Sequence, residues 1–185
     1  MASEYVEGVK KAMDKTIEAF TRELGTIRTG RASAASLGNI TVDYYGTATP
    51  VTQIAGIKTP EAHLLVIEPW DKSSLKAIEK AILASDLGIT PSNDGMVIRL
   101  PFPAPTEERR KELVKQCRQV AEEARVSIRN ARRDGNTKLD RAKKEDDMPE
   151  DEVKREQAEI QKQTDAYIAK IDELLKKKEA EVMEI

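Results

Sequence analysis

The sequence predicts an α+β protein, in which a long three-helix bundle (residues 1–30 and 106–185) carries a small inserted α+β domain (residues 31–105). Three observations predict this class. Apolar residues recur at steps of three and four near both ends of the chain, which is typical of amphipathic helices. The middle region instead contains short alternating runs bounded by glycine and proline. Aromatic residues make up only 4% of the 185 residues and charged residues 35%, a composition that favours helical bundles.

The first element is predicted to be an amphipathic helix that ends at Thr29-Gly30, because glycine commonly follows the last turn of a helix. Arg28 and Arg31 flank this glycine, and they can serve either the helix dipole or an anionic partner. The sequence leaves both roles open. The apolar positions of this helix are Val6, Val9, Met13, Ile17, Phe20, Leu24 and Ile27.

Residues 31–105 predict a small unit of short strands and one helix. Ser73 or Ser74 caps that helix, which is expected to stop at Gly88. The expected strands cover residues 40–44, 51–57, 64–67 and 97–100, with a turn at 45–47 and a loop at 91–95. A unit of roughly 75 residues lies near the lower limit for a self-supporting core.

The longest predicted element is a helix over residues 106–147, which would span roughly 60 Å. Thr106 can cap its first turn, and Glu107 and Glu108 then lie where the helix dipole is positive. Gly135 interrupts the pattern, and it either admits a neighbouring helix or marks a bend. The seam of apolar or small residues consists of Leu113, Cys117, Val120, Ala124, Ile128, Ala131, Gly135, Leu139 and Ala142.

A third helix is predicted to begin at Pro149, with acidic residues in its first turn. Val153, Ile160, Tyr167 and Leu174 recur every seven residues, interleaved with Thr164 and Ile171. None of the three long helices can bury its apolar seam alone, so we expect them to form one bundle.

Two connections join the predicted domains, and we expect them to form a hinge. Glycine gives the backbone of one connection conformational freedom, and prolines restrict the backbone of the other. Rigid packing of the two domains is the alternative, which the sequence leaves open. The hinge residues would be Arg28, Thr29, Gly30, Arg31, Pro101, Pro103 and Pro105.

A stripe of arginines lies beside the apolar seam of the longest helix, at about 100° per residue. From Arg109 to Arg133 the sequence has nine basic and three acidic residues, a balance of +6. Because few glutamates are available to pair with these arginines, we expect an anionic partner. The alternative is a solvated helix face that carries ion pairs. We define the arginine stripe as Arg118, Arg125, Arg129 and Arg132, with Arg133 at its edge.

The sequence offers little that is typical of catalysis, and we expect no enzyme activity and no cofactor. It contains no GxxxxGK phosphate loop and no HExxH zinc motif. His63 has no partner motif, Asp43 fits an outward-facing strand position, and Cys117 on the apolar seam is expected to be a core residue without a metal or disulfide role. No apolar run approaches 18 residues and no signal-peptide pattern begins at Met1, so we expect a cytoplasmic protein without a membrane association.

Five collinear segments together resemble the bacterial ribosome recycling factors, and this resemblance extends over the whole chain. They are IRTGRAS (27–33), VDYYGTATP (42–50), SDLGITPSNDG (85–95), PFPAPTEERRKELVK (101–115) and EEARVSIRNARRD (122–134). The resemblance implies an L-shaped protein with a three-helix bundle as its long arm and a β/α/β sandwich as its short arm. Gly135 departs from the helix former that we would expect there, which puts the stiffness of that helix in doubt.

The family resemblance also implies a function. Such a factor binds the large ribosomal subunit and its rRNA after termination and acts with elongation factor G, which hydrolyses GTP, to separate the subunits and release mRNA and tRNA. We expect it to act as a monomer. The family's RNA-contacting arginines match Arg110, Arg129 and Arg132, and Arg28 and Arg31 would lie near the elbow. A coiled-coil adaptor that binds protein partners through its acidic third helix is the alternative.

Overall fold

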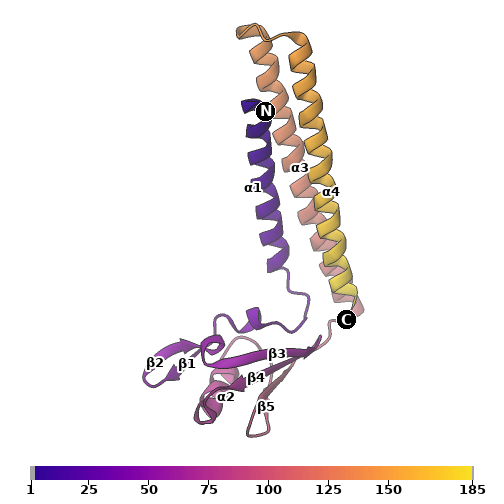
Figure 1. The fold of residues 1–185 in the computed structure, drawn as a ribbon. Helices are drawn as coiled ribbons and strands as arrows, with labels where there is room; N and C mark the ends of the chain where they lie inside the picture. Colours follow the sequence, from indigo (N-terminus) through magenta and orange to yellow (C-terminus); the bar gives the residue numbers. More distant parts are fainter. Residues whose placement is uncertain (1–2, 185) are drawn as a thin grey trace. The chain divides into compact units, whose positions relative to one another are not determined.

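The computed structural model describes residues 3–184, which fold into two compact units (Figure 1). One unit comprises the described residues up to Arg28 together with Glu107–Glu184, and the other comprises Thr29–Thr106. Each unit encloses a hydrophobic core of its own. The combination of long helices with a small antiparallel sheet confirms the predicted α+β class.

Three long helices form the first unit: α1 (Glu4–Thr26), α3 (Glu107–Glu145) and α4 (Glu150–Met183). They lie side by side, with α3 antiparallel to both α1 and α4 (Figure 1). Ser3 caps α1 by accepting a hydrogen bond from the Val6 amide. The buried core residues are Val6, Val9, Met13, Ile17, Phe20, Leu24, Cys117, Ala121, Ala124, Ile128, Leu139, Val153, Ile160 and Ile171.

Hydrogen bonds and ion pairs between the helices keep one register along the bundle. Arg118 pairs with Glu179 and Arg125 with Asp172, so a step of seven residues on α3 matches an opposite step of seven on α4. On the other side of α4, the Tyr167 hydroxyl donates to Asp14 of α1. Partial burial and this carboxylate raise the pKa of Tyr167 to about 12.

Gly135 lies at a point where α3 approaches both α1 and α4 closely. A Cβ atom at this position would lie 2.3 Å from Val9 Cγ2 of α1 and 3.2 Å from Ile160 Cδ1 of α4. The helix α3 continues unbroken through it. Of the two roles that the sequence left open, the structure therefore supports the admission of neighbouring helices.

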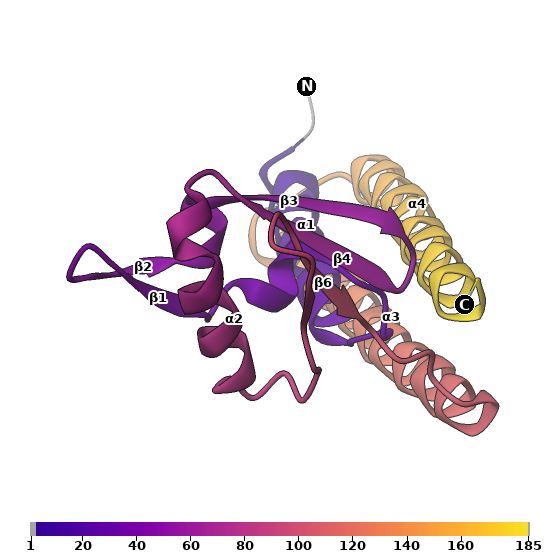
Figure 2. The same ribbon diagram turned by 90° about the horizontal axis from the view of Figure 1, so that it is seen from below.

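The second unit contains two antiparallel sheets and one helix. β1 (Thr41–Tyr44) and β2 (Thr47–Pro50) form a hairpin. β3 (Ala55–Glu61), β4 (Leu64–Pro69), β5 (Ser92–Asn93) and β6 (Ile98–Pro101) form a second sheet in the order β3-β4-β6-β5. Figure 2 shows the hairpin extending away from β3, β4 and β6.

The helix α2 (Leu75–Leu83) joins these two sheets in one core. Its buried residues Leu75, Ile78 and Ile82 belong to the same hydrophobic cluster as Val42 of β1 and Leu65 of β4. This packing gives the expected β/α/β unit. Three short 3-10 helices complete it: η1 (Ala34–Leu37), η2 (Val51–Gln53) and η3 (Lys72–Ser74).

Several predicted boundaries in this unit are wrong. Residues 51–53 form a 3-10 helix, so the strand expected at 51–57 begins later, at Ala55. The helix expected to reach Gly88 ends at Leu83. The strand β2 was not predicted, because its sequence Thr-Ala-Thr-Pro lacks apolar alternation and depends on pairing with β1. Positive φ angles at Tyr45 (50°) and Gly46 (83°) form the tight turn that makes this pairing possible.

The boundaries of the long helices differ less from prediction. The first helix ends at Thr26, before the expected Thr29-Gly30, and the longest runs from Glu107 to Glu145. The last begins at Glu150, directly after Pro149 as expected. Among residues 3–184, no helix combines the length and the apolar composition that a membrane crossing requires.

Candidate nucleic-acid interface

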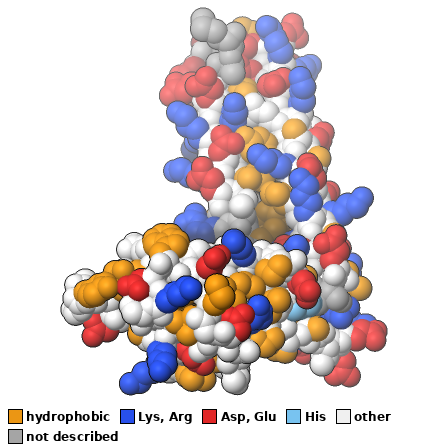
Figure 3. Space-filling view, turned by 60° about the horizontal axis from the view of Figure 1, so that its bottom comes forward, with side chains coloured by type: hydrophobic (Ala, Val, Ile, Leu, Met, Phe, Trp, Pro, Cys, Tyr) orange, Lys and Arg blue, Asp and Glu red, His pale blue; other side chains and the backbone are white. Residues whose placement is uncertain are grey.

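The arginine stripe lies on α3, beside the seam that faces the core of the bundle. Arg118 and Arg133 are exposed, whereas Arg125, Arg129 and Arg132 are half-buried. Acidic and basic side chains alternate over the visible face of this unit (Figure 3). The charge of the stripe therefore has to be judged together with its carboxylate neighbours.

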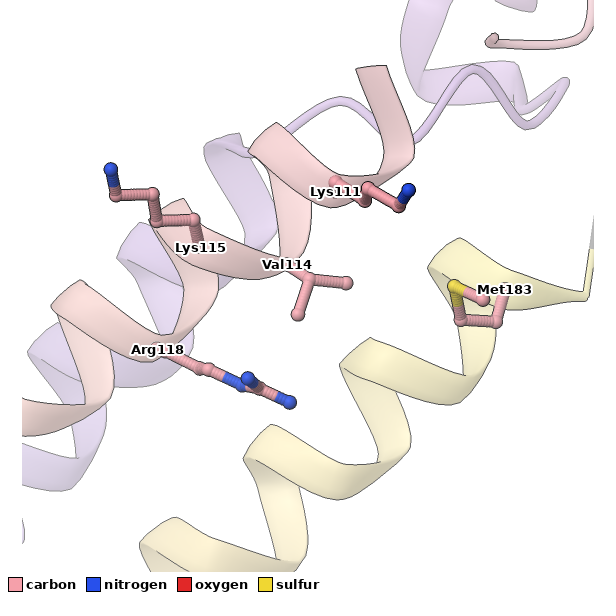
Figure 4. A pocket seen from close by; sticks show the side chains of 5 residues that line it. All are labelled: Lys111, Val114, Lys115, Arg118 and Met183. Atoms are coloured by element: carbon pink, nitrogen blue, oxygen red, sulfur yellow. The ribbon is translucent and has the colours of Figure 1, made fainter. Parts of the chain in front are cut away.

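Two arginines of the stripe form ion pairs with α4. Arg118 Nε donates to Glu179 Oε1 at 2.7 Å, and Figure 4 shows its side chain extending toward α4. Arg125 donates to Asp172 Oδ1 from both Nε (3.0 Å) and Nη2 (2.6 Å). The side chain of Arg125 is only 20% exposed, so this pair lies in the groove between the two helices.

Glu122 connects two members of the stripe. Its Oε2 accepts from Arg125 Nη1 and its Oε1 accepts from Arg129 Nη1, each at 3.0 Å. The hydrogen bond from Arg129, followed by that from Arg125, holds the pKa of the Glu122 carboxyl below its usual value. Glu122 is therefore negatively charged at neutral pH, and it offsets positive charge in the middle of the stripe.

Arg132 makes a weaker contact with α4. Its Nη1 donates to the Gln161 side chain at 3.3 Å, and Gln161 in turn donates to Asp165 at 2.8 Å. Arg132 therefore has a neutral partner, unlike Arg118 and Arg125. The Arg133 carbonyl accepts from Thr137 Oγ1 at 2.9 Å, but its side chain is exposed and makes no hydrogen bond or ion pair within the described part of the chain.

The sequence predicted few acidic partners for these arginines, and the structure shows such partners for Arg118, Arg125 and Arg129. The sequence near the stripe contains few glutamates, but α4 contributes Asp172 and Glu179 from 47 and 61 residues away. Sequence reasoning also missed the roles of Glu122 and Gln161. A usable signal existed, because Arg118, Arg125 and Arg132 are spaced by seven residues, as are Asp165, Asp172 and Glu179.

Arg110 does not group with the stripe. It lies in the first turns of α3, three residues before the buried Leu113 and seven before Cys117, which places it on the side of the apolar seam. It is half-buried, and its Nε has no hydrogen-bond partner among the described residues. The geometry of the helix therefore separates Arg110 from the other predicted RNA-binding arginines.

The pocket in Figure 4 is a shallow hollow of about 350 Å³ between α3 and the end of α4. Val114 and Met183 supply apolar surface, while Lys111, Lys115 and Arg118 surround it. Lys111 pairs with Glu107 at 3.0 Å. The hollow brings together cations and aliphatic carbon, and its lining residues include no Ser, Cys, His, Asp or Glu.

The structure also shows the local environment of Asp43, Cys117 and His63, the other residues that the sequence offers as candidates for chemistry. Asp43 Oδ1 accepts from the Gly46 amide at 2.9 Å and so stabilises the β1–β2 turn. Cys117 is buried, and desolvation raises the pKa of its thiol. His63 lies between β3 and β4, where its carbonyl accepts from the Phe102 amide at 2.6 Å. Within residues 3–184, no group of three or more His, Cys, Asp or Glu side chains is arranged to hold a metal ion.

The predicted hinge residues on the second unit lie close together. Gly30 has a φ of 79°, and a Cβ atom there would lie 3.2 Å from Pro105 Cδ. The Ala32 amide donates to the Ala62 carbonyl at 2.8 Å, which ties the chain after Gly30 to the β3–β4 turn. The glycine and proline connections therefore meet within the second unit, and any hinge action stays a prediction.

Comparisons with known proteins place the chain in one family. The family model described as "Ribosome recycling factor" matches residues 20–183. The chain is 55% identical to the ribosome-recycling factor of Geobacillus thermodenitrificans and 54% identical to that of Bacillus cytotoxicus, each over 185 residues and the full length of both chains.

Solved structures agree with these relatives. A solution structure of a ribosome recycling factor is 39% identical, covers all of both chains and has a TM-score of 0.74. The T. thermophilus factor is 48% identical, with 98% of this chain and 99% of that chain covered and a TM-score of 0.63. That factor comes from models in which it and E. coli elongation factor G are bound to the E. coli post-termination complex. The chain belongs to the ribosome recycling factor family.

Proposed function

We propose that this protein binds the post-termination ribosome and, with elongation factor G and GTP, promotes separation of the subunits and release of mRNA and tRNA. The observation that carries this proposal is the 48% identity, over nearly the whole chain, to a factor described together with elongation factor G on a post-termination complex. Both units fall within that match, whereas a coiled-coil adaptor would need only the helices. The adaptor alternative therefore has no observation in its favour.

The bundle would anchor the protein to RNA of the large subunit. Arg129, Arg132 and Arg133 are the best candidates in the stripe, because their guanidinium groups keep donors that no carboxylate of α4 occupies. Contacts of this kind to phosphates fix position and orientation without reading base sequence. Arg118 and Arg125 are weaker candidates, because Glu179 and Asp172 already accept from them. Arg110 would bind RNA separately from the stripe.

The protein would act without catalysis of its own. Elongation factor G would hydrolyse the GTP, and this chain would act in the cytoplasm as a monomer that transmits force between ribosomal contacts. The inserted domain of residues 31–105 would move relative to the bundle about the connections at Gly30 and at Pro101–Pro105. The support for this hinge is a glycine with positive φ in one connection and three prolines in the other.

The test is a polysome-breakdown assay with purified elongation factor G and GTP. The protein should convert polysomes to free subunits when both partners are present, and it should sediment with large subunits at low salt even without GTP. An adaptor would do neither. Elongation factor G from a distant organism serves as a mismatched control, and activity with no elongation factor G at all would contradict the proposal.

A disulfide formed between engineered cysteines, one in each domain, tests the hinge separately. The locked protein should bind ribosomes nearly as well as the reduced protein and should fail to separate subunits. Full activity in the locked state would exclude hinge motion as a requirement.

A further inference from the structure

Four charged side chains form a continuous ion-pair network across α3 and α4, in the order Asp172, Arg125, Glu122 and Arg129. Each link is short: 2.6 Å from Asp172 to Arg125, and 3.0 Å both from Arg125 to Glu122 and from Glu122 to Arg129. The two acids balance the two arginines in formal charge. This network therefore neutralises part of the positive charge that the arginines of α3 carry.

The two arginines in this network differ in their exposure and in the number of N–H donors that are already occupied. Arg125 is 20% exposed, and its Nε, Nη1 and Nη2 all donate to carboxylates. Arg129 is 40% exposed and donates to Glu122 through Nη1 alone. A guanidinium has five N–H donors in a fixed plane, so Arg129 keeps donors that point away from Glu122. A phosphate can therefore contact Arg129 while Glu122 stays in place.

We propose that Glu122 is a specificity-determining residue of the arginine stripe, which suppresses loose binding to RNA in general and preserves binding at a site that presents a phosphate to Arg129. This inference rests on the proposed function. Loose binding depends on uncompensated positive charge and on the counterions that it releases. Glu122 neutralises the positive charge of Arg129, because the two form an ion pair. Binding in a fixed geometry uses the remaining donors of Arg129 and so loses little.

The variant that tests this idea is Glu122→Gln, which keeps the shape of the side chain and removes its charge. Arg125 would still be held by Asp172, so the variant frees Arg129 specifically. The matched control is Glu123→Gln, which makes the same change of charge one residue along α3. Within the described residues, the Glu123 carboxylate accepts only from the Gln119 side chain, at 3.4 Å, and from no arginine.

Two ligands are compared over a range of salt concentrations: poly(U) as a general RNA, and purified large ribosomal subunits. For Glu122→Gln, the affinity for poly(U) at low salt should rise about two- to five-fold. Its salt dependence should steepen by about 0.7 in the slope of log affinity against log salt. The affinity for large subunits should change less than about two-fold. Glu123→Gln should have a smaller effect on poly(U), and Glu122→Gln should have none in an Arg129→Ala background.

Three results would overturn the inference. One is an unchanged affinity of Glu122→Gln for poly(U), and another is an equal gain for poly(U) and for large subunits. The third is an equal gain from Glu123→Gln, because the effect would then be one of net charge. The proposed function fails by a different result, in which the otherwise unchanged protein does not bind large subunits at all.

Discussion

Particular carboxylates in the two units of this protein stabilise different kinds of structure. In the inserted unit, Asp43, Asp71 and Asp94 each accept hydrogen bonds from backbone amides two or three residues further on, at 2.9 to 3.0 Å. In the bundle, Asp172 and Glu179 pair with side chains 47 and 61 residues away. Asp43, Asp71 and Asp94 therefore stabilise single turns, whereas Asp172 and Glu179 connect two helices.

This difference follows from what each architecture leaves unsatisfied. Tight turns between short strands expose amide groups that no strand partner reaches, and a nearby aspartate can accept from them. Long helices satisfy their own backbone, so their polar side chains are free to pair across the bundle. A surface charge in the bundle thus has to be interpreted through the neighbouring helix. The turn contacts of Asp43 and Asp94, by contrast, involve residues at most five positions further along the sequence.

The largest expected effect concerns the contact between helices at Gly135. Gly135→Ala would place a methyl group 2.3 Å from Val9 Cγ2, and we expect the free energy of unfolding to fall by about 1–3 kcal/mol. Thermal and denaturant unfolding of the purified protein would measure the loss. Gly8→Ala is the matched control, because a Cβ atom at Gly8 meets nothing within 4 Å.

The Gly8→Ala variant should be unchanged or more stable by up to about 1 kcal/mol, since alanine is the better helix former. Adding Val9→Ala to Gly135→Ala should recover part of the loss by making room for the methyl group. If Gly135→Ala were as stable as the unaltered protein, close helix packing at Gly135 would not be a requirement of the bundle.

A second prediction separates stability from binding within the arginine stripe. Arg125→Ala should lower the free energy of unfolding by about 1 kcal/mol, because it removes contacts to both Asp172 and Glu122. Arg132→Ala should stay within about 0.5 kcal/mol of the unaltered protein, because it loses only a contact to Gln161.

Ribosome binding should show the reverse order. Arg132→Ala should weaken the affinity for large subunits and lower its salt slope by about one or less, while Arg125→Ala should leave both nearly unchanged. Sedimentation with large subunits at several salt concentrations, alongside thermal melts, measures both effects. If Arg125→Ala weakened ribosome binding and Arg132→Ala did not, the assignment of Arg132 to binding and of Arg125 to stability would be wrong.

A third prediction uses the hydrogen bond from Tyr167 to Asp14, which links α4 to α1. The pKa of Tyr167 is raised from 10.0 to about 12 in the folded protein. A raised pKa gives stability that is complete below the unfolded value and is lost as the pH rises through the folded value. Between about pH 10 and pH 12, the unaltered protein should therefore lose more stability than Tyr167→Phe. Parallel alkaline slopes of the two melting curves would contradict this link.

The smallest effect is expected in the inserted unit, at the turn that Asp94 stabilises. Hydrogen bonds from the Val97 amide and from Arg99, together with the Met96 amide, hold the pKa of this carboxyl well below its usual value of 3.8. A lowered pKa gives stability that is present above the unfolded value and is lost as the pH falls through the folded value. Thermal melts should therefore show a smaller loss on acidification below about pH 4 for Asp94→Asn than for the unaltered protein.

Asp86→Asn is the control for this acid effect, because Asp86 is exposed and makes no hydrogen bond or ion pair within the described residues. Its acid melting curve should follow that of the unaltered protein. The change in Asp94→Asn should also be confined to signals from the inserted unit, such as the fluorescence of Trp70. An equal change in the helical signal would mean that the turn influences the bundle.

The sequence by itself determined the fold class and the three long helices, because a period of 3.6 residues persists over many turns and needs no partner to be recognised. Its resemblance to one family also led to a function that the comparisons support. Short strands were harder to predict. The strand β2 has no periodic pattern of its own, and it exists only because β1 lies beside it across the Tyr45-Gly46 turn.

Only the tertiary structure decided how the polar face of α3 is used. The local sequence presents an excess of arginines, but Asp172 and Glu179 arrive from α4 and occupy Arg125 and Arg118. The role of Gly135 was decided in the same way, by the position of Val9 on α1. The physical reason is that ion pairs and steric contacts depend on distances of a few ångströms between helices, and these distances follow from the packing of the whole bundle rather than from any one segment.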